Sequence, residues 1–184
     1  MKISRTSALA AIWGLAEATL FFIVPDVLLS WIALRSFKKA LWACLWALLG
    51  ALIGGVLIWY LGLVNPEPLR ELFTSIPAIN EGMLSNVRAQ LQNSGLVALF
   101  IGPLVGTPYK LYALEAAQLG YGLFVFLLVS IPARLMRFII VTMVSAAASR
   151  ALGRYVGVRT LQVLHIGVWV AFYSWYFYVM SSGS

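Results

Sequence analysis

Hydrophobic residues are grouped into five long segments along this chain. These segments cover residues 8–34, 40–63, 95–117, 121–148 and 161–180. Apolar runs of about 20 residues have the length that a helix needs to cross the hydrocarbon core of a bilayer. A transmembrane β-barrel would instead require short segments of alternating hydrophobicity. The pattern therefore predicts an all-α integral membrane protein, with a single membrane domain over residues 1–184.

Two of the five segments are interrupted near their middle. The first is broken at Pro25-Asp26, and the third at glycine and proline residues within 102–108. Proline disrupts helical hydrogen bonding, and broken backbone at membrane depth is tolerated only where protein or a water-filled cavity covers it. We therefore predict that both segments are re-entrant hairpins, which enter the membrane and return to the same side. The alternative is two kinked helices that cross the membrane, for which the first segment is long enough.

Charge along the chain favours the re-entrant alternative. Basic residues cluster at 2–5, 35–39 and 150–159, whereas the polar stretch 64–94 carries three glutamates against two arginines. Basic loops stay on the cytoplasmic side of a membrane. Two returning hairpins would place all three basic clusters in the cytoplasm and the acidic stretch outside, which five simple crossings cannot do. The N-terminus is then cytoplasmic in a multi-pass protein.

This topology leaves about three spanning helices, over 40–63, 121–148 and 161–180, and a surface helix over 79–92. If the two hairpins enter from opposite faces, the chain is an inverted repeat. Secondary transporters are built in this way, with their site at the membrane midplane where broken helices meet. The last four residues, 181–184, are interpreted as a cloning remnant outside this fold.

Composition agrees with a membrane protein. Hydrophobic residues make up 62% of the chain and charged residues 10%, and the mean hydropathy is +0.92. A soluble domain of 184 residues could not bury so much apolar surface. The net charge of +7 comes from residues beside hydrophobic segments, so it indicates anionic lipid headgroups as partners and not nucleic acid.

Six charged residues fall inside the apolar segments. They are Glu17, Asp26, Lys110, Glu115, Arg134 and Arg137. Each costs roughly 2.5–3.5 kcal/mol on membrane insertion scales, so each suggests either a function or a partner of opposite charge.

The acidic members of this set are candidates for proton coupling. A chain reversal at Pro25 would bring Glu17 and Asp26 to one cavity, and desolvation there would favour their protonated forms. The alternative is that both acids form structural pairs with the arginines of the fourth segment. Glu115 is the third candidate, and its alternative role is to balance a neighbouring charge.

The third segment carries the densest candidate for substrate binding. Gly102 and Gly106 permit close approach of the backbone, and unwound backbone exposes N–H groups that suit an anion. Lys110 adds a positive charge and Tyr109 a hydroxyl group, so the motif suits a phosphate headgroup. The alternative for Lys110 is that its side chain extends to the membrane interface.

Arg134 and Arg137 are three residues apart and therefore share one face of a helix. Two guanidinium groups in this arrangement suit bidentate binding of a phosphate. They suit equally the neutralisation of Glu17 and Asp26, and both roles can alternate during transport.

Other residue types point to no enzymatic chemistry. The chain has one histidine and one cysteine, no P-loop and no nucleophile elbow, so we predict neither an enzyme nor a metal or cofactor. Cys44 is interpreted as a packing residue. His165 is interpreted as an interfacial residue. A belt at the outer membrane interface is predicted from six aromatic residues of the last segment, Trp169, Phe172, Tyr173, Trp175, Tyr176 and Tyr178.

Taken together, these motifs resemble the DedA superfamily, a group of SNARE-associated-Golgi-type membrane proteins whose shared unit is called the VTT domain. The resemblance covers about residues 8–150. It rests on Glu17-x3-Phe21-x3-Pro25-Asp26, on the small-residue run Gly50-Ala51-x2-Gly54-Gly55-x4-Tyr60-x-Gly62, and on Phe100-x-Gly102-Pro103 to Lys110 followed by Arg134 and Arg137.

The resemblance implies two opposed re-entrant hairpins, with Glu17 and Asp26 at the positions of the essential membrane acids. Bacterial members are implicated in recycling undecaprenyl phosphate across the inner membrane, and eukaryotic relatives are lipid scramblases. Lys110 lies near a position where many members carry arginine in a phenylalanine-proline-arginine context. This chain has Gly-Thr-Pro-Tyr-Lys there, which keeps the charge but changes its surroundings.

We therefore expect a proton-coupled flippase or scramblase in the bacterial inner membrane that moves an anionic lipid phosphate, either undecaprenyl phosphate or a phospholipid. Its partners would be membrane lipids, protons and a second copy in a homo-oligomer. Two alternatives remain. One is a proton-coupled transporter of a small anion, and the other is a non-transporting membrane scaffold in which the buried charges only pair.

Overall fold

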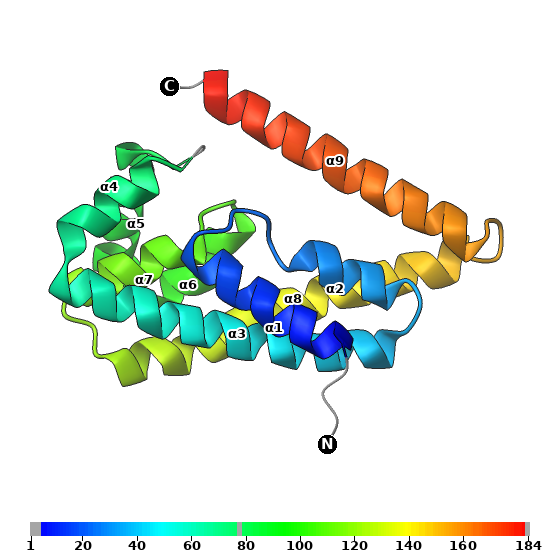
Figure 1. Cartoon of the computed structure of the whole chain (residues 1–184), viewed down its shortest axis with the longest axis horizontal. Coiled ribbons are helices and arrows are strands. Elements are labelled where there is room, and N and C mark those ends of the chain that lie inside the picture. The colour runs from blue at the N-terminus through cyan, green and yellow to red at the C-terminus, as the bar shows by residue number, and fades with distance from the viewer. Residues whose placement is uncertain (1–4, 77–78, 183–184) are drawn as a thin grey trace.

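The computed structural model describes residues 5–76 and 79–182, and every regular element in this part of the chain is a helix. Most of the helices lie along one long axis of the molecule (Figure 1). The chain is thus all-α, as its hydrophobic pattern predicts. Lys2 of the first basic cluster, Pro77 of the polar stretch and residues 183–184 of the predicted cloning remnant lie outside the described residues.

The first apolar segment forms two helices, α1 (Arg5–Thr19) and α2 (Asp26–Ala33), and the predicted interruption at Pro25 is present. Pro25 lacks an N–H group and directly precedes α2, where that group would have no helical partner. Asp26 then places a negative charge in the first turn, where the helix dipole favours it. The two helices run in opposite directions beside α3 (Phe37–Val64) (Figure 1).

Small residues let α1 and α3 approach until their backbones touch. A Cβ atom on Gly50 of α3 would lie 1.9 Å from the carbonyl oxygen of Ala11. A Cβ atom on Gly14 of α1 would lie 2.1 Å from the carbonyl oxygen of Ala47. Such close approach allows extensive van der Waals contact, which stabilises helix pairs where lipid removes the hydrophobic driving force. Gly14 and Gly50 therefore fix the position of α1, which carries Glu17.

We predict that Gly50→Leu separates α1 from α3 and destabilises the protein by ~3 kcal/mol, because the backbone of Ala11 cannot move aside as a flexible side chain would. The measurement is the fraction of monodisperse protein that remains after heating in detergent. Gly167→Leu in α9 is the matched control, since no atom lies within 4 Å of a Cβ placed there. Equal thermal survival of the two variants would contradict the role of this contact.

The polar stretch forms α4 (Pro66–Thr74) and α5 (Glu81–Ser94). The sequence predicts the second of these helices but not the first. The side chain of Asn80 caps α5, because its Oδ1 accepts a hydrogen bond of 2.8 Å from the Met83 amide. The helix buries one apolar stripe and exposes the rest, as expected of a helix at a surface.

The third apolar segment contains the second predicted interruption. It consists of the short turns η1 (Gly95–Val97), α6 (Ala98–Ile101) and η2 (Gly102–Leu104), followed after Pro108 by α7 (Tyr109–Gln118). Gly106 adopts a φ of 90°, which glycine accommodates without strain. The backbone thus reverses between 104 and 109 before α7 begins.

Two long helices complete the chain, α8 (Leu123–Leu152) and α9 (Val158–Ser182). Within the described residues, α3 and α8 are the two helices long and apolar enough to cross a membrane. The described part of the chain therefore contains two such helices, where the sequence predicts about three spanning helices. Helix α9 has 25 residues but is not one of these two.

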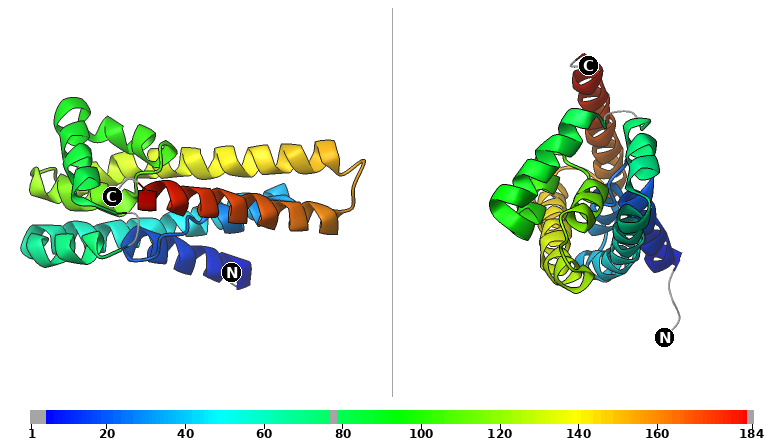
Figure 2. Two further views of the ribbon diagram at one scale, coloured as in Figure 1. Left: turned by 90° about the horizontal axis from the view of Figure 1, so that it is seen from above. Right: turned by 90° about the vertical axis from the view of Figure 1, so that its left-hand side faces the viewer.

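The second helix of each interrupted segment packs mainly on the long helix that follows the other segment. Helix α2 packs mainly on α8, whereas α7 packs mainly on α3. The long helices α3 and α8 run antiparallel and side by side (Figures 1 and 2). This exchange brings the 20–25 and 102–108 breaks, which are distant in sequence, toward the same place in the fold.

Candidate functional site

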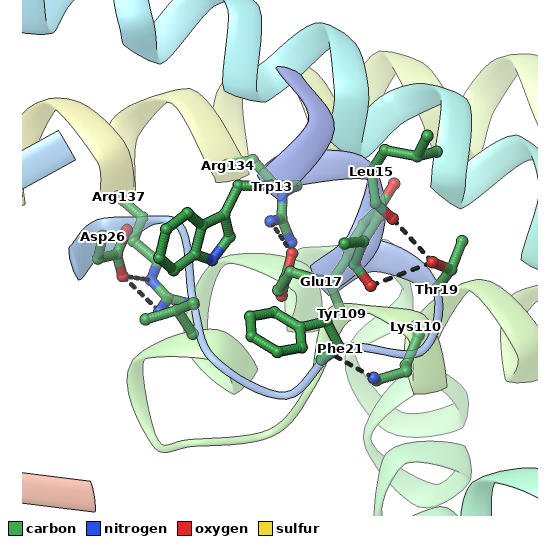
Figure 3. Close-up of polar contacts among 12 residues, drawn as sticks. Trp13, Leu15, Glu17, Thr19, Phe21, Asp26, Tyr109, Lys110, Arg134 and Arg137 are labelled. Atoms are coloured by element: carbon green, nitrogen blue, oxygen red, sulfur yellow. Dashed lines mark hydrogen bonds and ion pairs between the residues drawn. The ribbon is translucent and has the colours of Figure 1, made fainter. Parts of the chain in front are cut away.

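Both breaks line a cavity of about 220 Å³, which we call the central cavity. Phe21, Phe22 and Val24 line it from the first break, and Gly106 and other residues of 103–108 line it from the second. The two breaks are also joined directly, because the Nζ of the buried Lys110 donates a hydrogen bond of 3.1 Å to the carbonyl oxygen of Phe21 (Figure 3). The predicted meeting of the broken segments is therefore present.

Three acidic or basic side chains line the central cavity, and each comes from a different helix. They are Glu17 of α1, Lys110 of α7 and Arg137 of α8. The remaining walls are largely apolar or aromatic and include Ile140 of α8 and Phe172 of α9. With all three groups ionised, the cavity carries one net positive charge. Such a cavity suits an anionic group attached to an apolar body.

Glu17 pairs with Arg134, and both side chains are at most 5% exposed. Figure 3 shows the Arg134 guanidinium pointing toward the Glu17 carboxylate. The guanidinium carbon also lies 4.4 Å from the centroid of the Tyr109 ring and 5.2 Å from that of Phe138. Both contacts are cation–π interactions, which stabilise a desolvated cation. Arg134 is thus held by one carboxylate and two aromatic rings.

Asp26 pairs with Arg137 one helical turn further along α8. The Nε and Nη2 atoms of Arg137 donate hydrogen bonds of 2.9 and 2.5 Å to the Oδ2 of Asp26 (Figure 3). The Asp26 side chain is 3% exposed, and its Oδ1 has no hydrogen-bond partner in the part of the chain that the structure describes. Arg137 therefore connects a buried carboxylate to the central cavity.

The reversal near Pro25 brings Glu17 and Asp26 to neighbouring positions along one face of α8. Of these two acids, Glu17 lines the central cavity and Asp26 does not. Asp26 is instead paired with the Arg137 side chain. Of the two roles open to these acids from sequence, pairing with Arg134 and Arg137 is the one that the structure contains. Proton coupling requires in addition that these pairs open.

Glu115 lies outside the central cavity. Its fully buried carboxylate pairs with Arg70 of α4 and, through Oε2 at 3.4 Å, with Nη1 of Arg88 of α5. The charge-balancing role is thus the one present, and both partners come from the polar stretch. Glu115 joins α4 and α5 to α7 instead of facing the other two acids.

Two residues predicted to bind substrate have packing contacts in this structure. A Cβ atom on Gly102 would lie 1.7 Å from the Tyr112 hydroxyl oxygen, so Gly102 makes room for that ring. The Tyr109 hydroxyl donates a hydrogen bond of 3.0 Å to the Oγ of Ser130, and the residue is 1% exposed. Neither residue lines the central cavity, whereas Gly106 does.

Helix α9 contributes a wall of the cavity that the sequence interpretation assigns to an aromatic belt. Trp169, Phe172, Tyr173 and Tyr176 line it. The Tyr173 hydroxyl accepts a hydrogen bond of 2.9 Å from the Val24 amide. The Tyr176 hydroxyl has no hydrogen-bond partner among the described residues, although it is buried. The spacing of these four residues, i, i+3, i+4 and i+7, places them on one helical face and could have indicated a shared site.

His165 is more than an interfacial residue. Its Nε2 lies 2.7 Å from the Oγ of Ser30 on α2 and accepts a hydrogen bond of 3.0 Å from the Trp169 indole. Arg35, directly after α2, donates a hydrogen bond of 2.8 Å to the Oε1 of Gln162. Neutral side chains of α9 thus attach this helix to α2.

Comparison of the chain with protein-family models, curated proteins and solved structures finds no match. Among the described residues, no three His, Cys, Asp or Glu side chains gather as they would around a metal ion. What this chain does must therefore be inferred from its central cavity.

Proposed function

We propose that this protein is a membrane transporter, a flippase or scramblase, which moves a lipid with an anionic phosphate headgroup. The observation that carries the proposal is the central cavity itself. It combines two cations, Lys110 and Arg137, with apolar and aromatic walls. Lysine and arginine are the usual ligands of phosphate groups, and apolar walls suit the hydrocarbon part of the same molecule.

In this proposal α3 and α8 cross the bacterial inner membrane, and the segments containing α1–α2 and α6–α7 re-enter from opposite faces. The cytoplasmic N-terminus and the multi-pass topology follow from the three basic clusters. The exchanged packing of α2 on α8 and of α7 on α3 supports an inverted repeat of the kind expected for the DedA superfamily. The meeting of both breaks at one cavity supports a midplane transport site.

The buried ion pairs provide a route to proton coupling. The arginines on α8 are occupied by Glu17 and Asp26 while these acids are ionised. Protonation of an acid releases its arginine to bind the phosphate, and deprotonation returns the arginine and frees the lipid. Lys110 contributes a cation that is hydrogen-bonded to a neutral group, the Phe21 carbonyl. Exchange of this carbonyl for a phosphate is favourable, because the phosphate carries a negative charge.

A non-transporting scaffold is the second candidate. It is favoured by one specific observation, that Glu17 and Asp26 each pair with an arginine in a closed ion pair. Under this alternative the charges only hold α1 and α2 against α8, and no lipid enters the central cavity.

Transport in proteoliposomes tests the proposal. Vesicles would carry a fluorescent phosphatidylglycerol or a fluorescent undecaprenyl phosphate, and the membrane-impermeant reductant dithionite would quench the outer leaflet. We expect loss of fluorescence beyond one leaflet with at least one probe, and acceleration by a pH gradient. Quenching limited to one leaflet with both probes, at every pH gradient, would contradict transport of anionic lipids.

We predict that Tyr176→Phe slows this transport about two- to tenfold, the usual effect of removing one hydrogen bond. The buried Tyr176 hydroxyl has no partner in the described part of the chain, so it is available to the headgroup. Tyr60→Phe on an exposed position of α3 is the matched control and should transport normally. Identical rates for both variants would remove Tyr176 from the headgroup site.

A further inference from the structure

A second hollow lies directly beside the central cavity. It is a groove of about 650 Å³ between α9 and the segment that contains α1, the first break and α2. Val27 and Leu28 of α2 line one side, and Ile166 and Val170 of α9 line the other. Among the described residues, no Asp, Glu, Lys or Arg side chain lines it. We call this hollow the apolar groove.

The apolar groove and the central cavity share part of their walls. Phe21, Trp169 and Tyr173 line both hollows. The two hollows are thus adjacent. The central cavity is lined by one Glu, one Lys and one Arg side chain, and the groove by no Asp, Glu, Lys or Arg side chain among the described residues. This division matches the two ends of an amphiphile.

Three of the polar groups around the groove are engaged elsewhere. The Trp13 indole donates a hydrogen bond of 2.9 Å to the Ile23 carbonyl, and the Trp169 indole donates to His165. The Tyr173 hydroxyl accepts from the Val24 amide. These rings therefore present mainly their apolar faces to the groove, which favours a hydrocarbon occupant. The one buried polar atom of the groove without a partner among the described residues is the Nδ1 of His165.

We infer that the apolar groove binds the hydrocarbon chain of the lipid whose phosphate occupies the central cavity. This inference rests on the proposed function for the identity of the headgroup. It adds that α9 and α2 recognise the chain and that the ligand is held at both ends. A free phosphate would use only the central cavity.

Photo-crosslinking tests this assignment. Dodecyl phosphate with a diazirine near the end of its chain would be incorporated into proteoliposomes, irradiated and mapped on the protein by mass spectrometry. We expect the label on α2 and α9 at groove positions such as Leu28 and Val170. Label confined to other surfaces, including the α8-facing side of α9, would overturn the assignment.

Two controls separate a specific groove from a general lipid contact. Val170→Trp, at an exposed position, should fill the groove and cut labelling at least fivefold, whereas Val163→Trp, also exposed on α9 but outside the groove, should leave it unchanged. Dodecanol with the same diazirine lacks the phosphate and should label at least fivefold less. Equal labelling by the two probes, or equal effects of the two variants, would overturn the inference.

The outcome is separable from that of the proposed function. Groove labelling that depends on the phosphate, without lipid transport in proteoliposomes, would retain the groove and reject transport. Lipid transport with labelling elsewhere would retain transport and reject the groove. Elution of every variant as a single monodisperse peak establishes that each result concerns folded protein.

Discussion

Arg134→Met is expected to destabilise the protein by ~3–5 kcal/mol, because it leaves the Glu17 carboxylate buried without a partner. The loss should appear as a lower temperature of thermal aggregation in detergent and as a lower yield of monodisperse protein. Arg150→Met, in the last turn of α8, is the matched control, since Arg150 is exposed and outside the buried pairs. We expect that control to retain its stability.

The double variant Glu17→Gln with Arg134→Met separates structure from mechanism. Removing both charges eliminates the unpaired carboxylate, so at least half of the lost stability should return. If the pair also takes part in proton-coupled transport, the double variant regains stability but does not transport lipid. Recovery of both stability and transport would assign Glu17 and Arg134 a purely structural role within the transporter. Failure of Arg134→Met to destabilise would contradict the burial of this pair.

Lys110→Met is expected to reduce lipid transport at least tenfold. The substitution removes one of the two cations in the central cavity and lowers its net charge from +1 to zero, counted over Glu17, Lys110 and Arg137. Hydrogen bonds to charged groups contribute about 1.5–3 kcal/mol, which corresponds to roughly 10- to 150-fold. The initial rate of dithionite quenching measures the effect.

Lys38→Met at the exposed start of α3 is the control for loss of a lysine, and it should transport normally. Lys110→Arg keeps the charge and should retain more activity than Lys110→Met. Thermal stability is measured in parallel, since Lys110 also joins the two breaks. Equal transport by the methionine and wild-type proteins would exclude Lys110 from the headgroup site.

Local sequence determines much of this fold. The uninterrupted apolar runs predict α3 and α8, and Pro25 and the 102–108 motif predict where helices stop. Both follow from short-range chemistry, namely continuous hydrophobicity and the missing amide hydrogen of proline. The high cost of a buried charge likewise selects Glu17 and Arg134, although it leaves open whether they bind each other or a ligand.

Longer-range features were not predictable in the same way. Arg70 and Arg88 pair with Glu115 across α4, α5 and α7, and spacing alone cannot indicate which polar residue folds back onto a buried acid. The sequence around Gly102 is typical of a ligand-binding glycine, but the Tyr112 side chain occupies the space next to it. The role of α9 was missed because an aromatic face has the same pattern at a membrane interface and at a cavity wall.

The contacts around the central cavity also differ in the free energy needed to break them. The breaks and α8 are joined by buried ion pairs and by Lys110, so they form a stiff frame. Helix α9 is attached to α2 and the first break through neutral hydrogen bonds of His165 and Tyr173, each contributing about 1 kcal/mol, and through one hydrogen bond from the exposed Arg35 to Gln162. A molecule that enters sideways would therefore displace α9, which follows the turn at 153–157, before it disturbs the frame. Helix α9 is thus the wall of the central cavity that is displaced most easily, and the helices joined by ion pairs are its fixed walls.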